Sequence, residues 1–424
     1  MSRLTVSFLS LGCRVNQYEI RRFMERLGSK VEIIPFGQPA DVTIIDSCVV
    51  TQTAERDTRQ MVHRARRFSP DGLIILTGCY VDIHPQTSRE LEPGVFVFTR
   101  EEKDTIPTWI EERFHLHFDQ CENKNYSIQA LWPSAGRPPL VVQTGCDRRC
   151  AYCIIPLARG PSVSRPLPEI LSDITRYFQD SVAEVVLSGI NLGAWGADLH
   201  PRMKLADLLE LLLETIPPGR RLRLGSLEPE TIDDDLLQFV NHPRLAPHFH
   251  IPLQGTTHAV LQAMGRPVDI ASYRAIIEKL RARVLGCALG ADVIVGFPGE
   301  TDELFEEGLA FVEECNFSYL HVFPFSPRPG TRAATLPQLP SHVVRTRAAR
   351  MRALAAHMHE NFLHIWENKT VLVAVEKTHE NGVAEGMADR FFPVRFLLAN
   401  HCPSHLVPVR LERRQGEGFW GMSL

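Results

Sequence analysis

Three cysteines, Cys146, Cys150 and Cys153, stand in a C-x3-C-x2-C spacing and are called the loop trio below. Three thiolates so close along the chain can ligate a cubane 4Fe–4S cluster and leave its fourth iron open to a small molecule. Such an open iron indicates a catalytic cluster. The alternatives are a zinc site, although no second Cys or His pair follows Cys153, and a disulfide, which an odd trio cannot satisfy.

A second set, called the sheet trio, comprises Cys13, Cys48 and Cys79. Each follows an apolar run typical of a buried strand, and helical periodicity separates the runs. Because loops after parallel strands meet at one edge of a sheet, we expect the three thiols to converge and hold a second cluster. Taken singly, each could instead be a small buried hydrophobic residue. Four more cysteines show no pattern and are interpreted as core or incidental thiols: Cys121, Cys287, Cys315 and Cys402.

The composition bounds the class of protein. The chain has 424 residues and a net charge of −4, which fits an enzyme of two or three domains better than a strongly basic polyanion-binding protein. Its N-terminus has neither a basic segment nor a long apolar one. We therefore expect a cytoplasmic protein that does not enter a membrane.

The alternation of strand-like and helical segments predicts an α/β fold with three parts. Residues 1–116 are predicted to form an open parallel α/β domain, followed by a polar, proline-rich linker at 117–135. Residues 136–362 hold six strand-like runs with helical segments between them, which favours a partial (β/α)6 barrel. The runs are 140–143, 184–187, 221–224, 249–252, 291–295 and 319–323.

Glycines and hydrogen-bonding side chains follow the strands of the predicted barrel. The catalytic face of such a barrel lies at the carboxyl ends of its strands, where the loop trio also falls. We therefore expect these residues to contact a polar ligand, although each could instead serve a turn or a helix cap. They are Gly189, Asn191, Glu228, Gln254 and Gly296.

Residues 363–424 are predicted to form a small all-β barrel. Their strand-like runs lie at 370–376, 390–397 and 405–411. Cations and aromatic rings mix there, as on barrels that bind nucleic acid, but the balanced charge also fits a solvated surface around an aromatic core. The residues are Lys369, Lys377, Arg390, Phe391, Phe392, Arg395 and Arg410. Arginine-rich helical segments at 56–67 and 345–352 leave the same two interpretations open.

Five segments carry a resemblance that covers almost the whole chain, and the family they resemble is that of the radical S-adenosylmethionine methylthiotransferases. They are 11–19, 77–80, 152–160, 221–229 and 320–331. Within the family they are most similar to the bacterial type that acts on threonylcarbamoyladenosine in tRNA. The chain departs from the usual family residues at 253–257, Gly225, Val141 and Thr144, so the resemblance does not carry over the cofactor contacts around Gly255 and Thr256.

The resemblance implies an N-terminal cluster domain, a radical barrel and a C-terminal TRAM domain. It implies one 4Fe–4S cluster on each cysteine trio, with S-adenosylmethionine (SAM) near Tyr152 and the strand-end residues. The expected reaction inserts sulfur at C2 of N6-threonylcarbamoyladenosine at position 37 of tRNA and methylates it from SAM. The expected partners are the tRNA anticodon stem-loop, a flavodoxin- or ferredoxin-type electron donor and a sulfur source. Isopentenyladenosine in tRNA and an aspartate of a ribosomal protein are the alternative substrates.

Overall fold

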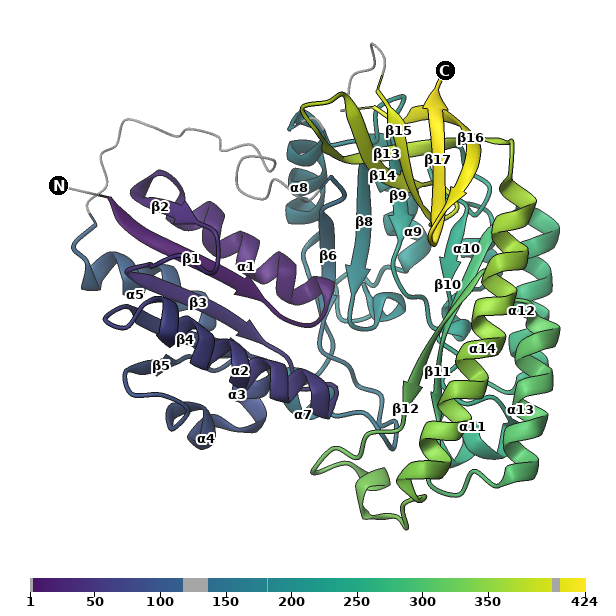
Figure 1. The fold of residues 1–424 in the computed structure, drawn as a ribbon, viewed down its shortest axis with the longest axis horizontal. Helices are drawn as coiled ribbons and strands as arrows, with labels where there is room; N and C mark the ends of the chain where they lie inside the picture. Colours follow the sequence, from purple (N-terminus) through teal and green to yellow (C-terminus); the bar gives the residue numbers. More distant parts are fainter. Residues whose placement is uncertain (1–2, 117–135, 181, 399–404) are drawn as a thin grey trace. The chain divides into compact units, whose positions relative to one another are not determined.

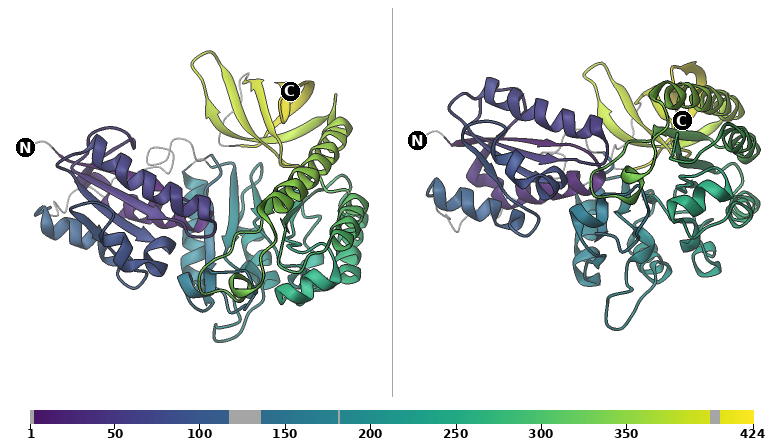
Figure 2. Two further views of the ribbon diagram at one scale, coloured as in Figure 1. Left: turned by 60° about the horizontal axis from the view of Figure 1, so that its bottom comes forward. Right: turned by 90° about the horizontal axis from the view of Figure 1, so that it is seen from below.

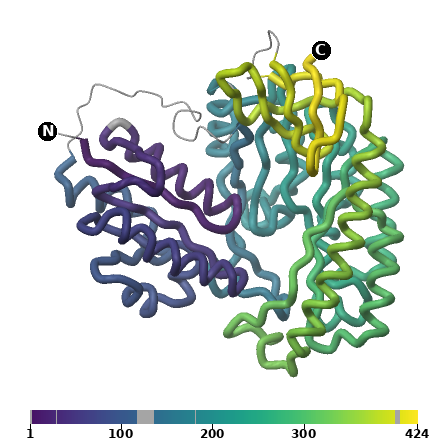
Figure 3. Tube along the Cα trace, in the orientation of Figure 1, coloured from purple at the N-terminus to yellow at the C-terminus, as the bar shows by residue number. Residues whose placement is uncertain are grey.

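The computed structural model describes most of the chain (Figure 3). The chain forms two compact units. The described residues are 3–116, 136–180, 182–398 and 405–424. The first unit comprises Met1–Pro133, Gly145–Arg148 and Cys153–Pro161. The second comprises Ser134–Thr144, Arg149–Tyr152 and Ser162–Leu424. The predicted linker at 117–135, Cys121 and Cys402 lie outside the described residues.

The first unit contains a parallel five-stranded sheet in the order β2-β1-β3-β4-β5, which confirms the predicted α/β domain (Figure 1). Its strands are β1 (Leu4–Ser10), β2 (Val31–Ile34), β3 (Val42–Ser47), β4 (Leu73–Gly78) and β5 (Val95–Val97). Its helices are α1 (Arg14–Leu27), α2 (Gln52–Phe68), α3 (Cys79–Ile83), α4 (Pro85–Arg89), α5 (Ile106–Arg113) and α7 (Ile155–Arg159). Apolar stripes of α1 and α5 cover one face of the sheet, while Val62 and Ala65 of α2 pack on the other.

The second unit contains the predicted partial barrel. Its six parallel strands are β6 (Pro139–Thr144), β8 (Glu184–Gly189), β9 (Arg221–Leu224), β10 (His248–His250), β11 (Ala288–Val295) and β12 (Tyr319–Pro324). They form two hydrogen-bonded sheets, β7-β6-β8-β9 and β10-β11-β12, where β7 (Val163–Ser164) is an antiparallel edge strand. Isolated bridges from Leu222 to Leu245 and from Ser226 to His250 connect the two sheets.

Helices alternate with these strands, as predicted. They are α8 (Leu167–Gln179), α9 (Leu205–Thr215), α10 (Asp234–Leu237), α11 (His258–Met264), α12 (Ile270–Arg283), α13 (Asp302–Cys315) and α14 (Ser341–Trp366). Figure 2 shows α14 passing beside β12 and leading to the C-terminal barrel, where Leu363 and Trp366 join the core. In the part of the chain that the structure describes, no helix is long and apolar enough to cross a membrane.

The C-terminal barrel is closed, in the order β13-β14-β15-β17-β16. Its strands are β13 (Thr370–Thr378), β14 (Val383–Ala388), β15 (Pro393–Leu397), β16 (Val407–Gln415) and β17 (Gly418–Ser423). Strands β14 and β17 were absent from the prediction because glycines interrupt their apolar pattern. A Cβ on Gly386 would lie 2.2 Å from the carbonyl oxygen of Ala374, and one on Gly418 would lie 2.0 Å from that of Pro393. These glycines allow the strands to pack closely around a small barrel.

Candidate active site: two cysteine trios

The sheet trio lies at the carboxyl ends of three neighbouring strands. Cys13 caps α1 after β1, Cys48 follows β3, and Cys79 begins α3 after β4. Strands β1, β3 and β4 are hydrogen-bonded in parallel, so their following loops leave the sheet at one edge. Sequence reasoning thus predicted the edge at which these cysteines lie.

Two glycines make room beneath these thiols. Gly12 has a φ of +94°, and a Cβ there would lie 2.8 Å from both Cβ and Sγ of Cys48. Gly78 has a φ of +93°, and a Cβ there would lie 2.1 Å from Oδ1 of the buried Asp46. A side chain at either position would be strained and would collide with the site. The result is a close-fitting backbone cradle around the trio.

A buried arginine that sequence reasoning missed contacts the trio. Arg159 Nε donates to Cys79 Sγ at 3.2 Å, and its Nη1 donates to Glu19 Oε1 at 3.1 Å. Its Nη2 donates to Asn16 Oδ1 at 2.7 Å, and the Cys13 thiol donates to the same oxygen at 3.2 Å. Arg159 belongs to the segment 152–160 that carries the family resemblance, which was the available signal. Its partners are far away along the chain, so no local pattern could indicate them.

Electrostatics of the sheet trio are dominated by burial. Burial raises the pKa of the Cys48 thiol, and it raises the pKa of Cys79 to about 12 although Arg159 acts in the opposite direction. The neighbouring Cys13 adds to both increases. Iron binds thiolates, and the positive charge of bound iron would reverse this balance. Three thiols at one edge of the sheet, a glycine cradle and one arginine therefore fit an iron–sulfur cluster.

The loop trio lies between β6 and α7, with Cys146 buried and the other two thiols half-buried. Within the first unit, the Cys146 N–H donates to the Gly160 carbonyl at 3.0 Å. Within the second unit, the Ala151 N–H donates to the Met264 carbonyl at 2.8 Å, and the Ala151 carbonyl accepts from Ala333 N–H at 2.8 Å. Backbone hydrogen bonds therefore hold the segment that carries the three cysteines.

Three of the predicted SAM contacts have defined surroundings in the second unit. The Asn191 N–H donates to Gln143 Oε1 at 2.8 Å, and Glu228 accepts from Arg266 Nη2 at 2.5 Å. Gln254 has a φ of +70°, a conformation that costs free energy in a residue other than glycine and is concentrated at functional sites. Their contact with SAM remains a prediction.

The other three predicted SAM contacts are Gly189, Tyr152 and Gly296. Gly189 ends β8, and Tyr152 packs against the apolar cluster that contains Ala151. Gly296 has a φ of +78°, and a Cβ there would lie 2.7 Å from a methyl group of Val344 on α14. Helix packing alone therefore accounts for the glycine at 296, while its role toward SAM remains a prediction.

Three residues of the predicted nucleic-acid face make packing contacts, in line with the alternative interpretation of a solvated surface around an aromatic core. Phe392 lies in the barrel core, and Phe391 stacks on His248 with ring centroids 4.3 Å apart. Arg390 lies over the Trp366 ring, 4.7 Å from its centroid. These three residues serve packing, which periodicity could not distinguish from a binding face.

One arginine in each of the two arginine-rich helical segments bonds oxygen atoms of the protein itself. On α14, the buried Arg347 donates to Glu300 Oε2 at 2.8 Å and to Asp302 Oδ1 at 2.6 Å. On α2, Arg66 donates to the carbonyl oxygen of Gly72 at 2.8 Å and to that of Pro93 at 2.7 Å. Their guanidinium groups thus bind protein oxygens.

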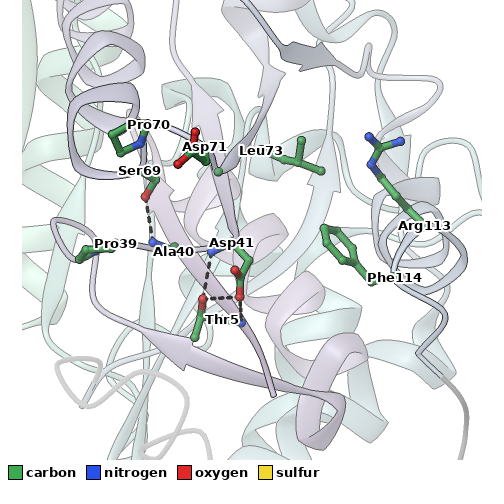
Figure 4. Close-up of a pocket in the computed structure, with 11 residues that line it drawn as sticks. Thr5, Pro39, Ala40, Asp41, Ser69, Pro70, Asp71, Leu73, Arg113 and Phe114 are labelled. Atoms are coloured by element: carbon green, nitrogen blue, oxygen red, sulfur yellow. Dashed lines mark hydrogen bonds between the residues drawn. The ribbon is translucent and has the colours of Figure 1, made fainter. Parts of the chain in front are cut away.

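A pocket in the first unit lies at the amino ends of the strands, away from the sheet trio (Figure 4). Asp41 Oδ2 accepts from the Thr5 N–H at 2.8 Å and from its hydroxyl at 2.7 Å, while Ser69 Oγ accepts from the Ala40 N–H at 2.8 Å. These polar groups satisfy one another and fix the strand starts, so we assign the pocket a structural role.

Two family models match the chain. The first, described as Uncharacterized protein family UPF0004, matches residues 5–99, which include the sheet trio. The second, the Radical SAM superfamily, matches residues 140–312, which include the loop trio. The fold and the two cysteine sets thus define a radical SAM enzyme with an additional N-terminal cysteine domain. The radical SAM domain implies a 4Fe–4S cluster and SAM as cofactors.

Relatives along nearly the full length identify the family. The threonylcarbamoyladenosine tRNA methylthiotransferase MtaB of Bacillus subtilis (strain 168) is 31% identical, covering 96% of this chain and 93% of the relative. The protein of that name from Chlamydia pneumoniae is 34% identical, covering 98% and 97%. The chain belongs to the threonylcarbamoyladenosine tRNA methylthiotransferase family. A solved radical S-adenosylmethionine methyltransferase, TsrM from Kitasatospora setae, shares the fold at a TM-score of 0.58 and 12% identity over 79% of this chain and 77% of that one.

Proposed function

We propose that this enzyme methylthiolates C2 of N6-threonylcarbamoyladenosine at position 37 of tRNA. The observation that carries the proposal is near-full-length similarity to enzymes named for this nucleoside. Both cysteine trios are present, and the sheet trio has the cradle described above. An adenosine in an anticodon loop can enter a protein pocket at a lower unstacking cost than a base in a duplex.

The chain's own residues would hold the two clusters. Cys146, Cys150 and Cys153 would ligate the cluster that cleaves SAM, while the sheet trio would ligate a second, sulfur-donating cluster. When bound, the clusters and SAM supply radical hydrogen abstraction, the sulfur atom and the methyl group. Arg159 would orient the Cys79 sulfur through its 3.2 Å hydrogen bond, and burial of Cys48 and Cys79 would keep water from the second cluster.

The remaining assignments follow from this reaction. We assign residues 1–116 to the sheet-trio domain, 136–362 to the radical core and 363–424 to a TRAM domain that binds the anticodon stem-loop. Lys377, Arg395 and Arg410 are the cations of the predicted binding face that lie in the strands of the barrel. A flavodoxin- or ferredoxin-type donor would supply electrons and a separate protein or small thiol the sulfur. All these partners are cytoplasmic, which is where we place the enzyme.

The test compares the nucleosides of total tRNA by mass spectrometry in cells that lack the gene and in complemented cells. Complementation with wild type should restore 2-methylthio-N6-threonylcarbamoyladenosine, whereas Cys79→Ala and Cys150→Ala should leave its precursor accumulated. Cys287→Ala, a core thiol outside both trios, is the matched control and should complement. If cells that lack the gene lose the isopentenyl derivative instead, the proposed substrate is wrong. If neither nucleoside changes, the substrate to test next is a ribosomal-protein aspartate.

A further inference from the structure

Three side chains on adjacent barrel strands form a compact polar group, called the His–Asp cluster: His250, Asp292 and His321. Asp292 Oδ1 lies 3.1 Å from His250 Nε2 and 3.0 Å from His321 Nδ1. Asp292 and His321 are register partners on β11 and β12, and His250 ends the neighbouring β10. Their ligand atoms all lie within 4.8 Å of one another. The carboxylate thus joins two imidazoles on one face of the sheet.

A hydrogen-bond chain supports the cluster from behind. The Tyr319 hydroxyl lies 2.9 Å from His250 Nδ1 and 2.8 Å from His248 Nε2. Gly290 makes room for this ring, because a Cβ there would lie 2.0 Å from Tyr319 Cζ. The chain runs from His248 through Tyr319, His250 and Asp292 to His321. It therefore fixes the orientation of each ring, as supporting hydrogen bonds do for a binding site.

The exposed end of this chain is His321, whose side chain is 54% exposed, whereas that of Asp292 is 21% exposed. Because His321 Nδ1 bonds Asp292, the other ring nitrogen, Nε2, is left for a ligand. Burial opposes ionisation of Asp292, but hydrogen bonds from His250 and His321 outweigh it and hold its pKa well below the usual range. Phe323, two residues along the same strand face, is 41% exposed and offers an apolar surface beside the imidazole.

The cluster borders the residues predicted to contact SAM. The Gln254 N–H donates to the Asp292 carbonyl at 2.8 Å, and the Leu227 N–H, next to Glu228, donates to the His250 carbonyl at 2.9 Å. A group on this face therefore adjoins the expected cofactor contacts, where a substrate must approach.

We propose that the His–Asp cluster binds the threonylcarbamoyl group of the target adenosine, with His321 Nε2 donating to the threonine carboxylate. The inference rests on the proposed function and names the residues that recognise its substrate. His321 as an imidazolium would lie between the Asp292 carboxylate and the substrate carboxylate, a charge-assisted arrangement. An isopentenyl group has no polar atom for it and would leave the imidazole without its partner, so the site selects against that substituent.

The test uses the holoenzyme with both clusters and anticodon stem-loops of one sequence. One stem-loop carries threonylcarbamoyladenosine, one its neutral threoninamide analogue and one plain adenosine. His321→Ala should weaken binding of the threonylcarbamoyl loop by about tenfold or more and raise its KM more than it lowers kcat. Binding of the threoninamide and plain loops should change little. His321→Gln, which keeps a donor, should recover part of the affinity.

His364→Ala provides the matched control, because this histidine is 80% exposed on α14, away from the cluster. It should bind all three loops as wild type does. Equal weakening of all three loops in His321→Ala, or no weakening, would overturn the inference. One divalent ion per chain beyond the cluster iron, lost in Asp292→Asn, would overturn it in favour of a metal site, since His and Asp ligands also suit such ions. A wild type that converts only an isopentenyladenosine loop would instead refute the proposed function.

Discussion

One carboxylate of the radical core, the fully buried Glu184, holds arginines that bond the C-terminal barrel. It accepts from Arg223 Nε at 2.6 Å and Nη2 at 2.9 Å, from Arg221 Nε at 2.5 Å and from Arg137 Nη1 at 3.3 Å. The remaining donors of Arg221 and Arg223 bond carbonyl oxygens of the barrel, which are those of Leu372, Met387, Ala388 and Asp389. Glu184 thus holds the arginines that attach the barrel.

Glu184→Gln tests this account because it removes the charge and keeps the shape. Loss of one partner from a buried ion pair costs about 3–5 kcal/mol, since the other charges are left buried without compensation. With a urea slope of about 3 kcal/mol/M, the unfolding midpoint of the second unit should fall by about 1–1.7 M. Peptides covering residues 370–424 should also exchange their amide hydrogens faster, as measured by mass spectrometry.

The stabilisation that Glu184 provides should decrease as the pH falls. Burial alone would raise the pKa of Glu184, but Arg221, Arg223 and Arg137 hold it well below its usual range. A depressed carboxyl pKa stabilises the fold above the unfolded-state pKa of about 4.3, and this stabilisation is lost as the pH falls through the folded-state value. The difference between wild type and Glu184→Gln should therefore be full at pH 7 and pH 5 and shrink only below that range.

Glu306→Gln is the matched control for this experiment. Glu306 pairs with Arg350, but both side chains are about half exposed, so solvent screens the pair and the midpoint should not change. If Glu184→Gln unfolds at the wild-type urea concentration, the attachment does not depend on the buried charge and the reasoning is refuted.

Three further predictions concern the cysteine trios. Cys150→Ser should remove about four irons per chain and abolish 5'-deoxyadenosine formation, measured by iron analysis and chromatography. Gly12→Ala should lower iron loading at the sheet trio, because the new methyl group would lie 2.8 Å from Cys48 Sγ at a φ of +94°; Mössbauer spectra would show the loss. Arg159→Lys should shift the reduction potential of the second cluster, measured by redox titration, because lysine cannot reproduce the Nε bond to Cys79 together with the bonds to two oxygens.

Controls distinguish these effects from general loss of folding. Gly382→Ala introduces a methyl group at a φ of +78° with no atom within 4 Å, so iron loading should match wild type. Iron loading by Gly12→Ala equal to that of Gly382→Ala would contradict the role of the cradle. An unchanged potential in Arg159→Lys, with full iron content, would contradict the role of the arginine.

Local pattern in the sequence was enough to predict the two cysteine trios and most of the helices and strands. The spacing of the loop trio and the apolar runs before Cys13, Cys48 and Cys79 are local features, and parallel strand order brings their loops to one edge. The helices Ile270–Arg283 and Asp302–Cys315 lie between predicted strands, and each begins after a side chain that caps its first turn, Asp269 or Thr301. Spacings, apolar runs and helix caps each depend on only a few neighbouring residues, so the sequence is sufficient to recognise them.

Tertiary structure alone decided which distant polar groups meet. Arg159 reaches Glu19, 140 residues away along the chain, and Glu184 joins strands β8 and β9 to the C-terminal barrel. The His–Asp cluster likewise exists only because strand register places Asp292 beside His321. The periodicity of a segment predicts whether a side chain is buried. It does not predict the partner of that side chain, because the packing of sheets and helices determines the partner. For the same reason Phe391 and Phe392 were candidates for a binding face, whereas Phe392 lies in the barrel core and Phe391 stacks on His248.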